Sequence, residues 1–416
     1  MNIAIIGAGP AGSVLASLVA QRGHAVAVFD ENKRPDLIVG ESLVPGLIPV
    51  LRRLGIEDRV AKIGVLKPGV TFYPGSGKKV AFCFSSLPRR YPQYAYNVPR
   101  PQFDRILQDR FMELGVELVE TRVSLFSEGD HIRLASETLA LAKTFKGAEP
   151  DLVVDASGRR RLSARLLGIG ARLGPRKDVS HFSHFAGFEP EHPAGQVRIN
   201  RLQNGWAWRI PLRGKMSFGI VMDQQAAAAL GSTPEERLEN AARQDPLLEQ
   251  EIKGLKRVSN VQTYGNYQLI SDRGVGANWV AVGDAFGFVD PMLSPGMMVA
   301  VESAVVLDSI LSGGDHLNSA LLKYSGYMTA QLEAWMDLIS YFYDGRIFEL
   351  HELGMEMQAR HTNLPFGFLE RFMSANMAGM ASGFTTASPF SRSVLRWMDR
   401  FVVGAERTPS LKYAIA

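Results

Sequence analysis

The chain has little of what several classes of protein require. It contains one cysteine, Cys83, in 416 residues, which excludes a disulfide framework and any multi-cysteine zinc or iron–sulfur site and predicts a reducing, cytoplasmic location. No apolar run is long enough to cross a membrane, and the first apolar stretch, residues 3–6, has no basic residue before it and runs into glycines. The sequence therefore predicts neither a signal peptide nor a transmembrane segment.

An excess of charge is also lacking. A total of 46 basic and 42 acidic side chains leave a net charge of +4, which gives no support to nucleic acid binding. The longest basic cluster, residues 159–161, holds three arginines and is interpreted as solvated surface charge. His181 and His184 are three apart in an expected strand, where they face opposite sides, so no metal site is predicted. No Gly-x-Ser-x-Gly segment is present, which leaves a nucleophile elbow without support.

The first thirty residues, in contrast, predict a βαβ unit. Residues 2–6 and 25–29 are short apolar runs typical of buried strands, and residues 10–22 have the apolar spacing of a helix. The segment GAGPAG lies between the first strand and the helix. A strand before it, a helix after it and an acid about 20 residues on make this a specific sign of a bound dinucleotide.

Each glycine of this segment has a physical task. Gly7 permits the tight turn, Gly9 lets the backbone approach a pyrophosphate, and Gly12 lets the helix and strand pack closely. The helix N-terminus offers unpaired N–H groups and the positive end of its dipole to the phosphates. Asp30, at the end of the second strand, is expected to accept a hydrogen bond from the adenosine ribose.

Further along, two kinds of pattern alternate. Helices are expected over residues 100–114 and 296–311, an extended segment over 116–120, a buried strand over 151–155 and an apolar strand over 280–282. From about 179 to 225 the pattern becomes alternating and aromatic, which predicts a second, antiparallel sheet that could form a substrate platform. Past about residue 317 the chain indicates helices rich in Met and aromatic residues.

Four segments in this order resemble the FAD-binding framework of the flavoprotein aromatic hydroxylase and halogenase superfamily. They are GAGPAG, Arg100 ahead of FDRIL, DLVVDASGR, and AVGDAFGFVDP. The resemblance covers roughly residues 1–330 and implies an α/β fold with a discontinuous Rossmann-like FAD-binding domain, an inserted antiparallel-sheet substrate domain and a helical C-terminal region. We predict the FAD-binding domain over 1–70, 100–178 and 275–316, the substrate domain over 71–99 and 179–274, and the helical region over 317–416.

The resemblance also implies which residues hold FAD. Arg100 is expected to reach the FAD phosphates, Asp155 to lie near the cofactor, and Asp284 to contact the ribityl and phosphate region. The turn from Asp290 and the helix start after it are expected beside the N1–C2=O edge of the flavin, where a helix N-terminus stabilises negative charge. The predicted cofactor-binding residues are Gly7, Gly9, Pro10, Ala11, Gly12, Asp30, Glu41, Ser42, Arg100, Asp155, Gly283, Asp284, Pro291, Gly296 and Met297.

Three further segments point to the halogenase branch of that superfamily. Residues 206–211, WAWRIP, resemble its WxWxIP motif, and Gly40-Glu41-Ser42 resembles the GES segment that these enzymes hold beside the flavin. Lys67 falls where halogenases carry the lysine that presents hypohalous acid to the substrate. We therefore predict Lys67 as the catalytic residue, although by itself it would be interpreted as a solvated turn lysine. Trp206 and Trp208 are expected to share one strand face and to pack the core.

The resemblance predicts an FAD-dependent monooxygenase that uses reduced flavin and O2, through a C4a-hydroperoxide, to hydroxylate or halogenate an electron-rich aromatic. The aromatic is either free or tethered to a carrier or protein, and without a second dinucleotide fingerprint either a separate reductase supplies reduced flavin or nicotinamide binds transiently. The alternatives are a geranylgeranyl-type reductase of prenyl lipids and a flavin-carrying assembly factor without turnover. Ser294-Pro295-Gly296 departs from the Ser-Thr-Gly of many halogenases. Glu302 and Glu349 are the candidate partner carboxylates for the lysine.

Overall fold

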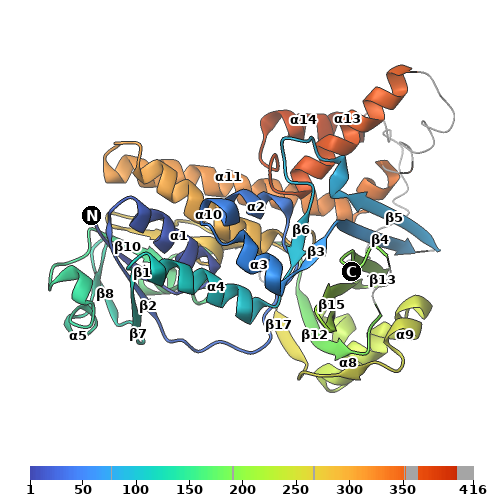
Figure 1. Cartoon of the computed structure of the whole chain (residues 1–416), viewed down its shortest axis with the longest axis horizontal. Helices are drawn as coiled ribbons and strands as arrows, with labels where there is room; N and C mark the ends of the chain where they lie inside the picture. Colours follow the sequence, from blue (N-terminus) through green and yellow to red (C-terminus); the bar gives the residue numbers. More distant parts are fainter. Residues whose placement is uncertain (76, 190–191, 266–267, 351, 353–363, 401–416) are drawn as a thin grey trace.

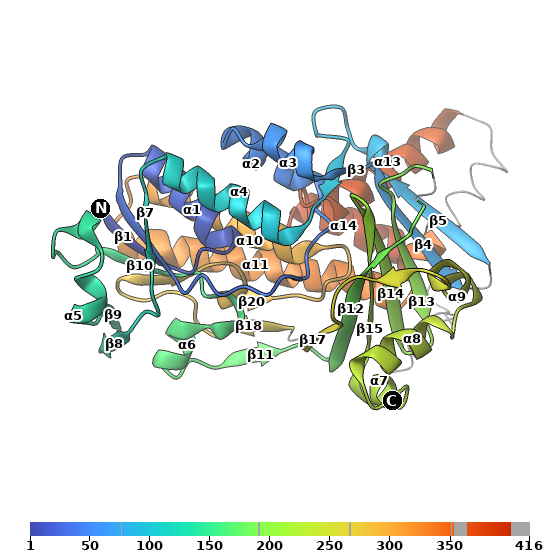
Figure 2. The ribbon, with the colours of Figure 1, turned by 60° about the horizontal axis from the view of Figure 1, so that its bottom comes forward.

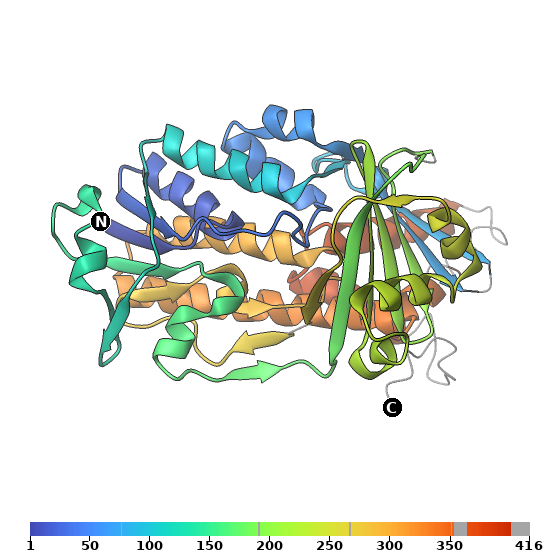
Figure 3. The same ribbon diagram turned by 90° about the horizontal axis from the view of Figure 1, so that it is seen from below.

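The computed structural model describes residues 1–75, 77–189, 192–265, 268–350, 352 and 364–400. Two sheets lie near opposite ends of an elongated molecule, and long helices run between them (Figures 1 and 3). The first sheet has five strands in the order β19-β10-β1-β2-β7, all parallel. The strands are β1 Asn2–Ile6, β2 Ala25–Asp30, β7 Glu117–Glu120, β10 Leu152–Asp155 and β19 Trp279–Ala281.

Helices cover one face of this sheet (Figure 2). Helix α1 packs between α4 and α10, and α10 packs against α11. The other face packs against apolar side chains that include Leu134 and Phe145. Because both faces of the sheet are covered, its central strands are apolar throughout rather than alternating, and Ile3, Ala4 and Ile5 are all fully buried. The bounds of these helices are α1 Pro10–Gln21, α4 Arg100–Glu113, α10 Pro295–Leu311 and α11 Leu317–Tyr343.

The second sheet has eight strands and is antiparallel except where β13 runs parallel to β4. Its order is β16-β12-β15-β14-β13-β4-β5, with β17 also pairing with β12. Helices α7 Gln224–Ala228, α8 Pro234–Ala242 and α9 Pro246–Ile252 contribute to an apolar cluster on one face. The strands are β4 Gly69–Gly75, β5 Lys78–Cys83, β12 Asp178–Ala186, β13 Val197–Leu202, β14 Gly205–Leu212, β15 Lys215–Asp223, β16 Lys256–Arg257 and β17 Gln262–Gly265.

Shorter elements connect and cover the two sheets. Strands β3 and β6 pair with each other, β8 pairs with β9, and β18 lies between β11 and β20. Helices α13 and α14 pack together beyond α11. The bounds are β3 Val65–Lys67, β6 Ala95–Asn97, β8 Leu125–Glu128, β9 His131–Leu134, β11 Ala171–Leu173, β18 Leu269–Ser271, β20 Gly287–Phe288, α2 Ile48–Arg53, α3 Glu57–Ile63, α5 Ser136–Leu139, α6 Leu162–Leu166, α13 Leu364–Ala381 and α14 Pro389–Met398.

The predicted fold class is confirmed, since a parallel sheet with crossover helices is joined to a mainly antiparallel sheet and to C-terminal helices. The end of a predicted element shifts at α10, which begins at Pro295, one residue before the predicted start, because proline suits the first turn of a helix. The domain boundaries stay a prediction, and residues 353–363 and 401–416 of the predicted helical region lie outside the described residues. No helix in the described ranges is long and apolar enough to span a membrane.

Candidate active site

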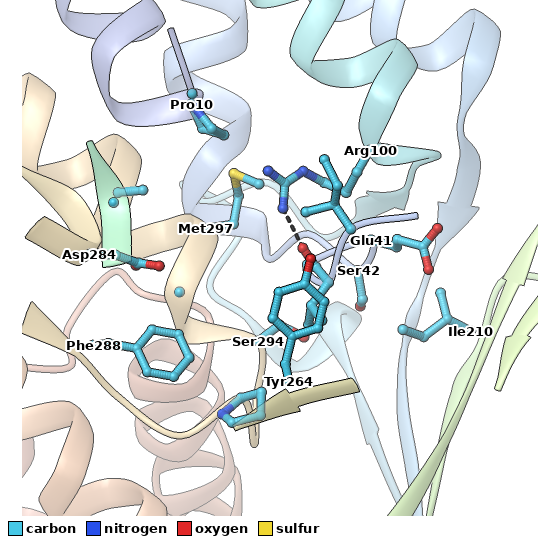
Figure 4. Close-up of a pocket in the computed structure, with 18 of the residues that line it drawn as sticks. Pro10, Glu41, Ser42, Arg100, Ile210, Tyr264, Asp284, Phe288, Ser294 and Met297 are labelled. Carbon is cyan, nitrogen blue, oxygen red and sulfur yellow. Dashed lines mark hydrogen bonds between the residues drawn. The ribbon is translucent and has the colours of Figure 1, made fainter. Parts of the chain in front are cut away.

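A cavity of about 320 Å³ opens between the carboxyl ends of the parallel strands and the second sheet. Figure 4 shows Asp284, Phe288, Tyr264 and Met297 around it. Ten of the predicted cofactor-binding residues line it: Gly9, Pro10, Ala11, Glu41, Ser42, Arg100, Asp284, Pro291, Gly296 and Met297. Gly7, Gly12, Asp30, Asp155 and Gly283 are not among its lining residues.

The glycine turn has the geometry that its spacing predicts. Gly7 has φ +110°, a region that favours glycine. A Cβ on Gly12 would overlap the carbonyl oxygen of Gly7, whereas a Cβ on Gly9 would meet no atom within 4 Å and would extend into open space. No side chain caps the N-terminus of α1, and its first turn carries no acid. Its N–H groups are therefore available to an anion.

Two predicted acids are occupied by protein donors. Asp30 accepts hydrogen bonds from the backbone N–H of Ala8 at 2.7 Å and from Arg34 at 3.1 Å, so it braces the glycine turn. Asp155 accepts from the backbone N–H and the hydroxyl of both Ser157 and Ser163, and thereby ties the end of β10 to α6. Their contact with a cofactor stays a prediction.

Charged groups of both signs face the cavity. The Arg100 guanidinium is held by Asp104 at 3.0 Å and by the carbonyl of Val39. Burial raises the pKa of Asp284, and the charges of Arg159 and Arg100 oppose that rise. Arg159 lies over the ring of Phe288, 4.2 Å from its centroid. The interpretation of residues 159–161 as solvated charge is therefore wrong for Arg159. The sequence pattern misses this contact because the Phe288 ring comes from a distant strand.

The loop ahead of α10 is held in a strained form. Leu293 and Ser294 both have positive φ, +70° and +60°, which is uncommon for residues with a side chain. A buried network fixes the loop from below: Tyr343 donates to the carboxylate of Asp290 at 2.7 Å and accepts from the indole N–H of Trp206 at 2.9 Å. Gly296 and Met297 thus present the uncapped N-terminus of α10 to the cavity.

The far wall of the cavity is apolar and comes from the second sheet. Trp206 and Trp208 share one face of β14, with ring centroids 5.7 Å apart, as predicted. Both indoles also line the cavity, together with Phe182 and Tyr264. Sequence reasoning missed the last two as site residues, since alternation alone does not say which side of a strand faces a cavity.

The GES segment points in two directions. Glu41 is buried, and its carboxylate is hydrogen-bonded to Nε2 of His184 at 2.8 Å. The other ring nitrogen of His184 lies 3.0 Å from the amine of Lys215. On the other side, Lys67 donates to the hydroxyl of Ser42 at 2.8 Å and to the carbonyl of Leu43 at 2.9 Å. The segment therefore links the large cavity to the predicted catalytic lysine.

Lys67 is 1% exposed, so its interpretation as a solvated turn lysine is wrong. Burial lowers the pKa of its amine from 10.5 to about 7, because an apolar setting disfavours the charged form. It lines a second cavity of about 40 Å³ together with aromatic side chains, among them Phe72 and Phe342. Leu293 lines both cavities.

Neither candidate carboxylate accompanies the lysine. Glu302 on α10 accepts from Tyr327 at 2.6 Å and from Gln331 at 2.7 Å, which fastens α10 to α11. Glu302 and Glu349 are both absent from the residues that line the lysine cavity, and no described residue of that lining is acidic. The described residues also contain no cluster of acids, histidines and cysteines that could hold a metal ion.

The large cavity fits FAD on three observations. Two uncapped helix N-termini, those of α1 and α10, and two arginines suit a negatively charged diphosphate and flavin edge. Gly9 leaves open space where the diphosphate is expected. The apolar wall of Trp206, Trp208 and Phe182 suits a large aromatic ring system. Arg100 and Gly9 would hold the phosphates, and Pro291 to Met297 would border the flavin.

Comparisons with known proteins agree with this geometry. The family model described as tryptophan halogenase matches residues 2–92 and 85–347. A tryptophan 2-halogenase of Chondromyces crocatus is 27% identical over 396 residues, which cover 92% of this chain and 75% of that protein. A Pseudomonas fluorescens chlorinase of 1H-pyrrole-2-carbonyl on a peptidyl-carrier protein is 27% identical over 377 residues, covering 82% of this chain and 83% of that one.

A solved structure of the flavin-dependent brominase Bmp2 superposes with a TM-score of 0.77 at 22% sequence identity. The superposition covers 96% of this chain and 100% of that chain. The similarity shows that the two share a fold.

Proposed function

The chain belongs to the tryptophan halogenase family, and from this we propose that it transfers a halogen to an electron-rich aromatic ring, with Lys67 as the catalytic residue. It is an FAD-dependent oxidoreductase. Reduced FAD supplies the chemistry that turns O2 and a halide ion into hypohalous acid. The family match favours this function over the prenyl-lipid reductase and the assembly factor.

The position of Lys67 is the observation that carries the proposal. Lys67 lines a second cavity beside the one that fits FAD. Its amine donates to Ser42, which lines the FAD cavity, and Leu293 lines both. Direct transfer of oxygen from a flavin requires the substrate carbon to touch the flavin. A lysine set apart from the flavin suits instead a small oxidant that leaves the first cavity and is received in the second. This arrangement favours halogenation over direct hydroxylation.

Lys67 has the properties that such a step needs. With a pKa of about 7, a large fraction of the amine is neutral near pH 7 and can react as a nucleophile. The neutral amine takes the halogen from hypohalous acid and releases water; the aromatic ring then takes the halogen from nitrogen and loses a proton, which returns to the nitrogen and restores the amine. In a second form of the step, the ammonium group donates a hydrogen bond to hypohalous acid and so activates it. Ser42 and Leu43 fix the amine in either case.

The partners follow from the relatives. The Pseudomonas chlorinase acts on a carrier-bound pyrrole, and we propose that this chain takes either a free or a carrier-tethered aromatic. We also propose that a separate flavin reductase in the cytoplasm supplies its reduced flavin, since the single dinucleotide fingerprint predicts no second domain for a nicotinamide. Proteins that copurify with the chain under mild conditions would identify a carrier.

The test reconstitutes the protein with FAD, a flavin reductase and NADH, and follows phenols, pyrroles and indoles by mass spectrometry with and without bromide. A bromide-dependent mass gain is expected. Lys67→Ala should abolish it while FAD stays bound, and Lys62→Ala, on the outer helix α3, should not change it. A gain of one oxygen without regard to bromide would replace halogenation by hydroxylation, and full turnover by Lys67→Ala would remove the lysine from the mechanism.

A further inference from the structure

The lysine cavity is almost wholly apolar, and its polar side chains can be counted. Among the described lining residues, only Lys67 and Ser382 have a nitrogen or oxygen atom in the side chain. Cys83, which is exposed, adds a thiol. The other lining residues are Val44, Val70, Phe72, Phe82, Phe84, Leu293, Leu338, Phe342, Ile347, Met377, Ala378 and Ala381. Any ligand that brings a polar group into this cavity therefore has few protein partners to meet.

Ser382 stands out among buried hydroxyls. Its side chain is 1% exposed, and its Oγ has no hydrogen-bond partner among the described residues. Buried hydroxyls are nearly always paired, because removal from water without a new partner is unfavourable. The amine of Lys67 differs, since it donates to Ser42 and Leu43. Ser382 thus belongs to the lining of the cavity and carries a buried hydroxyl that has no partner among the described residues.

The backbone around Ser382 is firmly tied, so the hydroxyl is held in place. The carbonyl of Ser382 accepts from the N–H of Gly46 at 2.9 Å, and a Cβ on Gly46 would lie 2.6 Å from that carbonyl oxygen. Close approach of the two segments therefore depends on glycine. Thr386 donates to the carbonyl of Met380 at 2.6 Å and closes the turn after α13. These contacts fix Ser382 beside the segment that also holds Lys67.

We propose that the Ser382 hydroxyl is a substrate-orienting group that receives the ring N–H or the phenolic O–H of the aromatic substrate. This inference rests on the proposed function and deepens it. A ring that is electron-rich through a pyrrole nitrogen or a phenolic oxygen brings one strong donor with it. That donor must be paired once the ring is buried between Phe72, Phe82 and Phe342. Ser382 is placed to pair it, and in doing so it decides which ring carbon faces Lys67.

The experiment measures binding of two matched probes to the FAD-loaded protein. Dissociation constants for 4-fluorophenol and 4-fluoroanisole are obtained by ¹⁹F NMR titration; the second probe lacks the donor. Wild type should bind 4-fluorophenol about 3- to 10-fold more tightly, as expected for one hydrogen bond. Ser382→Ala should remove this preference, and Ser382→Cys, with a weaker acceptor of similar size, should give an intermediate value.

Thr385→Val is the matched control. The Thr385 hydroxyl is also buried and has no partner in the part of the chain that the structure describes, but Thr385 does not line the cavity. This variant should therefore keep the wild-type preference. In the absence of probe, Ser382→Ala should unfold at the same temperature as wild type or higher, because it removes an unpaired hydroxyl. A lower unfolding temperature would give Ser382 a purely structural role.

Equal affinity of wild type for both probes would overturn the inference, and so would a preference that survives in Ser382→Ala. Binding of neither probe to wild type would also overturn it. Bromination of phenol is measured in parallel, so that failure of this inference can be distinguished from failure of the proposed function. A probe preference without bromide-dependent bromination would refute the function and leave the binding role, whereas bromination with an unchanged ortho-to-para ratio in Ser382→Ala would refute the orienting role alone.

Discussion

Burial of an amine that ionises at about pH 7 predicts a measurable cost in stability. The pKa of Lys67 is about 7 in the folded protein and 10.5 in a solvated lysine. Between these values the unfolded state binds more protons than the folded state. The free energy of unfolding therefore rises with pH across this window. The destabilisation caused by the buried amine is largest at and below pH 7.

The magnitude follows from the two pKa values. Each unit of difference is worth about 1.4 kcal/mol, and the difference builds up to about 3–4 kcal/mol between pH 10 and pH 7. Lys67→Met keeps the length of the side chain and removes the titrating group. The variant should therefore be the more stable protein at pH 7, and its advantage should shrink steadily as the pH is raised to 10.

The assay is urea unfolding of the FAD-loaded protein at pH 7, 8, 9 and 10. All other titrating groups are shared, so they cancel in the difference between wild type and Lys67→Met. Lys62→Met, on α3, tests this cancellation. Its free energy of unfolding should change with pH in parallel with that of wild type. Parallel curves for Lys67→Met as well would refute the reasoning, since they would mean that Lys67 keeps an ordinary pKa despite its burial.

Three further predictions concern catalysis, the glycine turn and the buried network. If Lys67 carries the halogen as a neutral amine, the rate of bromination should rise as pH increases through about 7; a fall through the same range would assign it the hydrogen-bonding role, and a flat profile would contradict both. Gly9→Ala should fold normally, because its Cβ meets no protein atom, yet bind FAD at least about 10-fold more weakly, as followed by flavin fluorescence. Gly12→Ala should lower the unfolding temperature without FAD, because its Cβ overlaps the backbone, and equal behaviour of these two variants would contradict the proposed cradle. Tyr343→Phe leaves the indole N–H of Trp206 and a buried carboxylate without their shared partner, and should cost about 1–3 kcal/mol of unfolding free energy; denaturation at wild-type concentrations of urea would show that the network does not hold the loop.

Much of the fold could be predicted because its signals are local. The strand, turn and helix of residues 2–21 follow from apolar spacing and from three glycines within six positions, and the structure has these elements with ends shifted by one residue at most. The start of α10 could also be predicted to within one residue, since a proline followed by a glycine is typical of a turn that leads into a helix. In each case the residues that decide the structure are close together in the chain.

Other features could not be predicted, because the partners are far apart in the chain. Arg159 appeared to be one of three solvated arginines, yet it lies over Phe288, more than a hundred residues away. No sequence pattern singled out Ser382, whose partner segment at Gly46 comes from the other end of the chain. Its unpaired hydroxyl is visible only after every other donor and acceptor has been placed.

Lys67 illustrates which properties the sequence determines and which depend on the tertiary structure. The sequence by itself determined a dinucleotide turn and, by resemblance, the position of a lysine, because motifs record local geometry and residue order. Only the tertiary structure decided that this lysine is buried, is held by Ser42 and Leu43, and lines a second cavity. A pKa depends on the surroundings that packing creates. Residue type and order therefore indicated the chemistry, and the packing of distant segments set the conditions under which Lys67 can perform it.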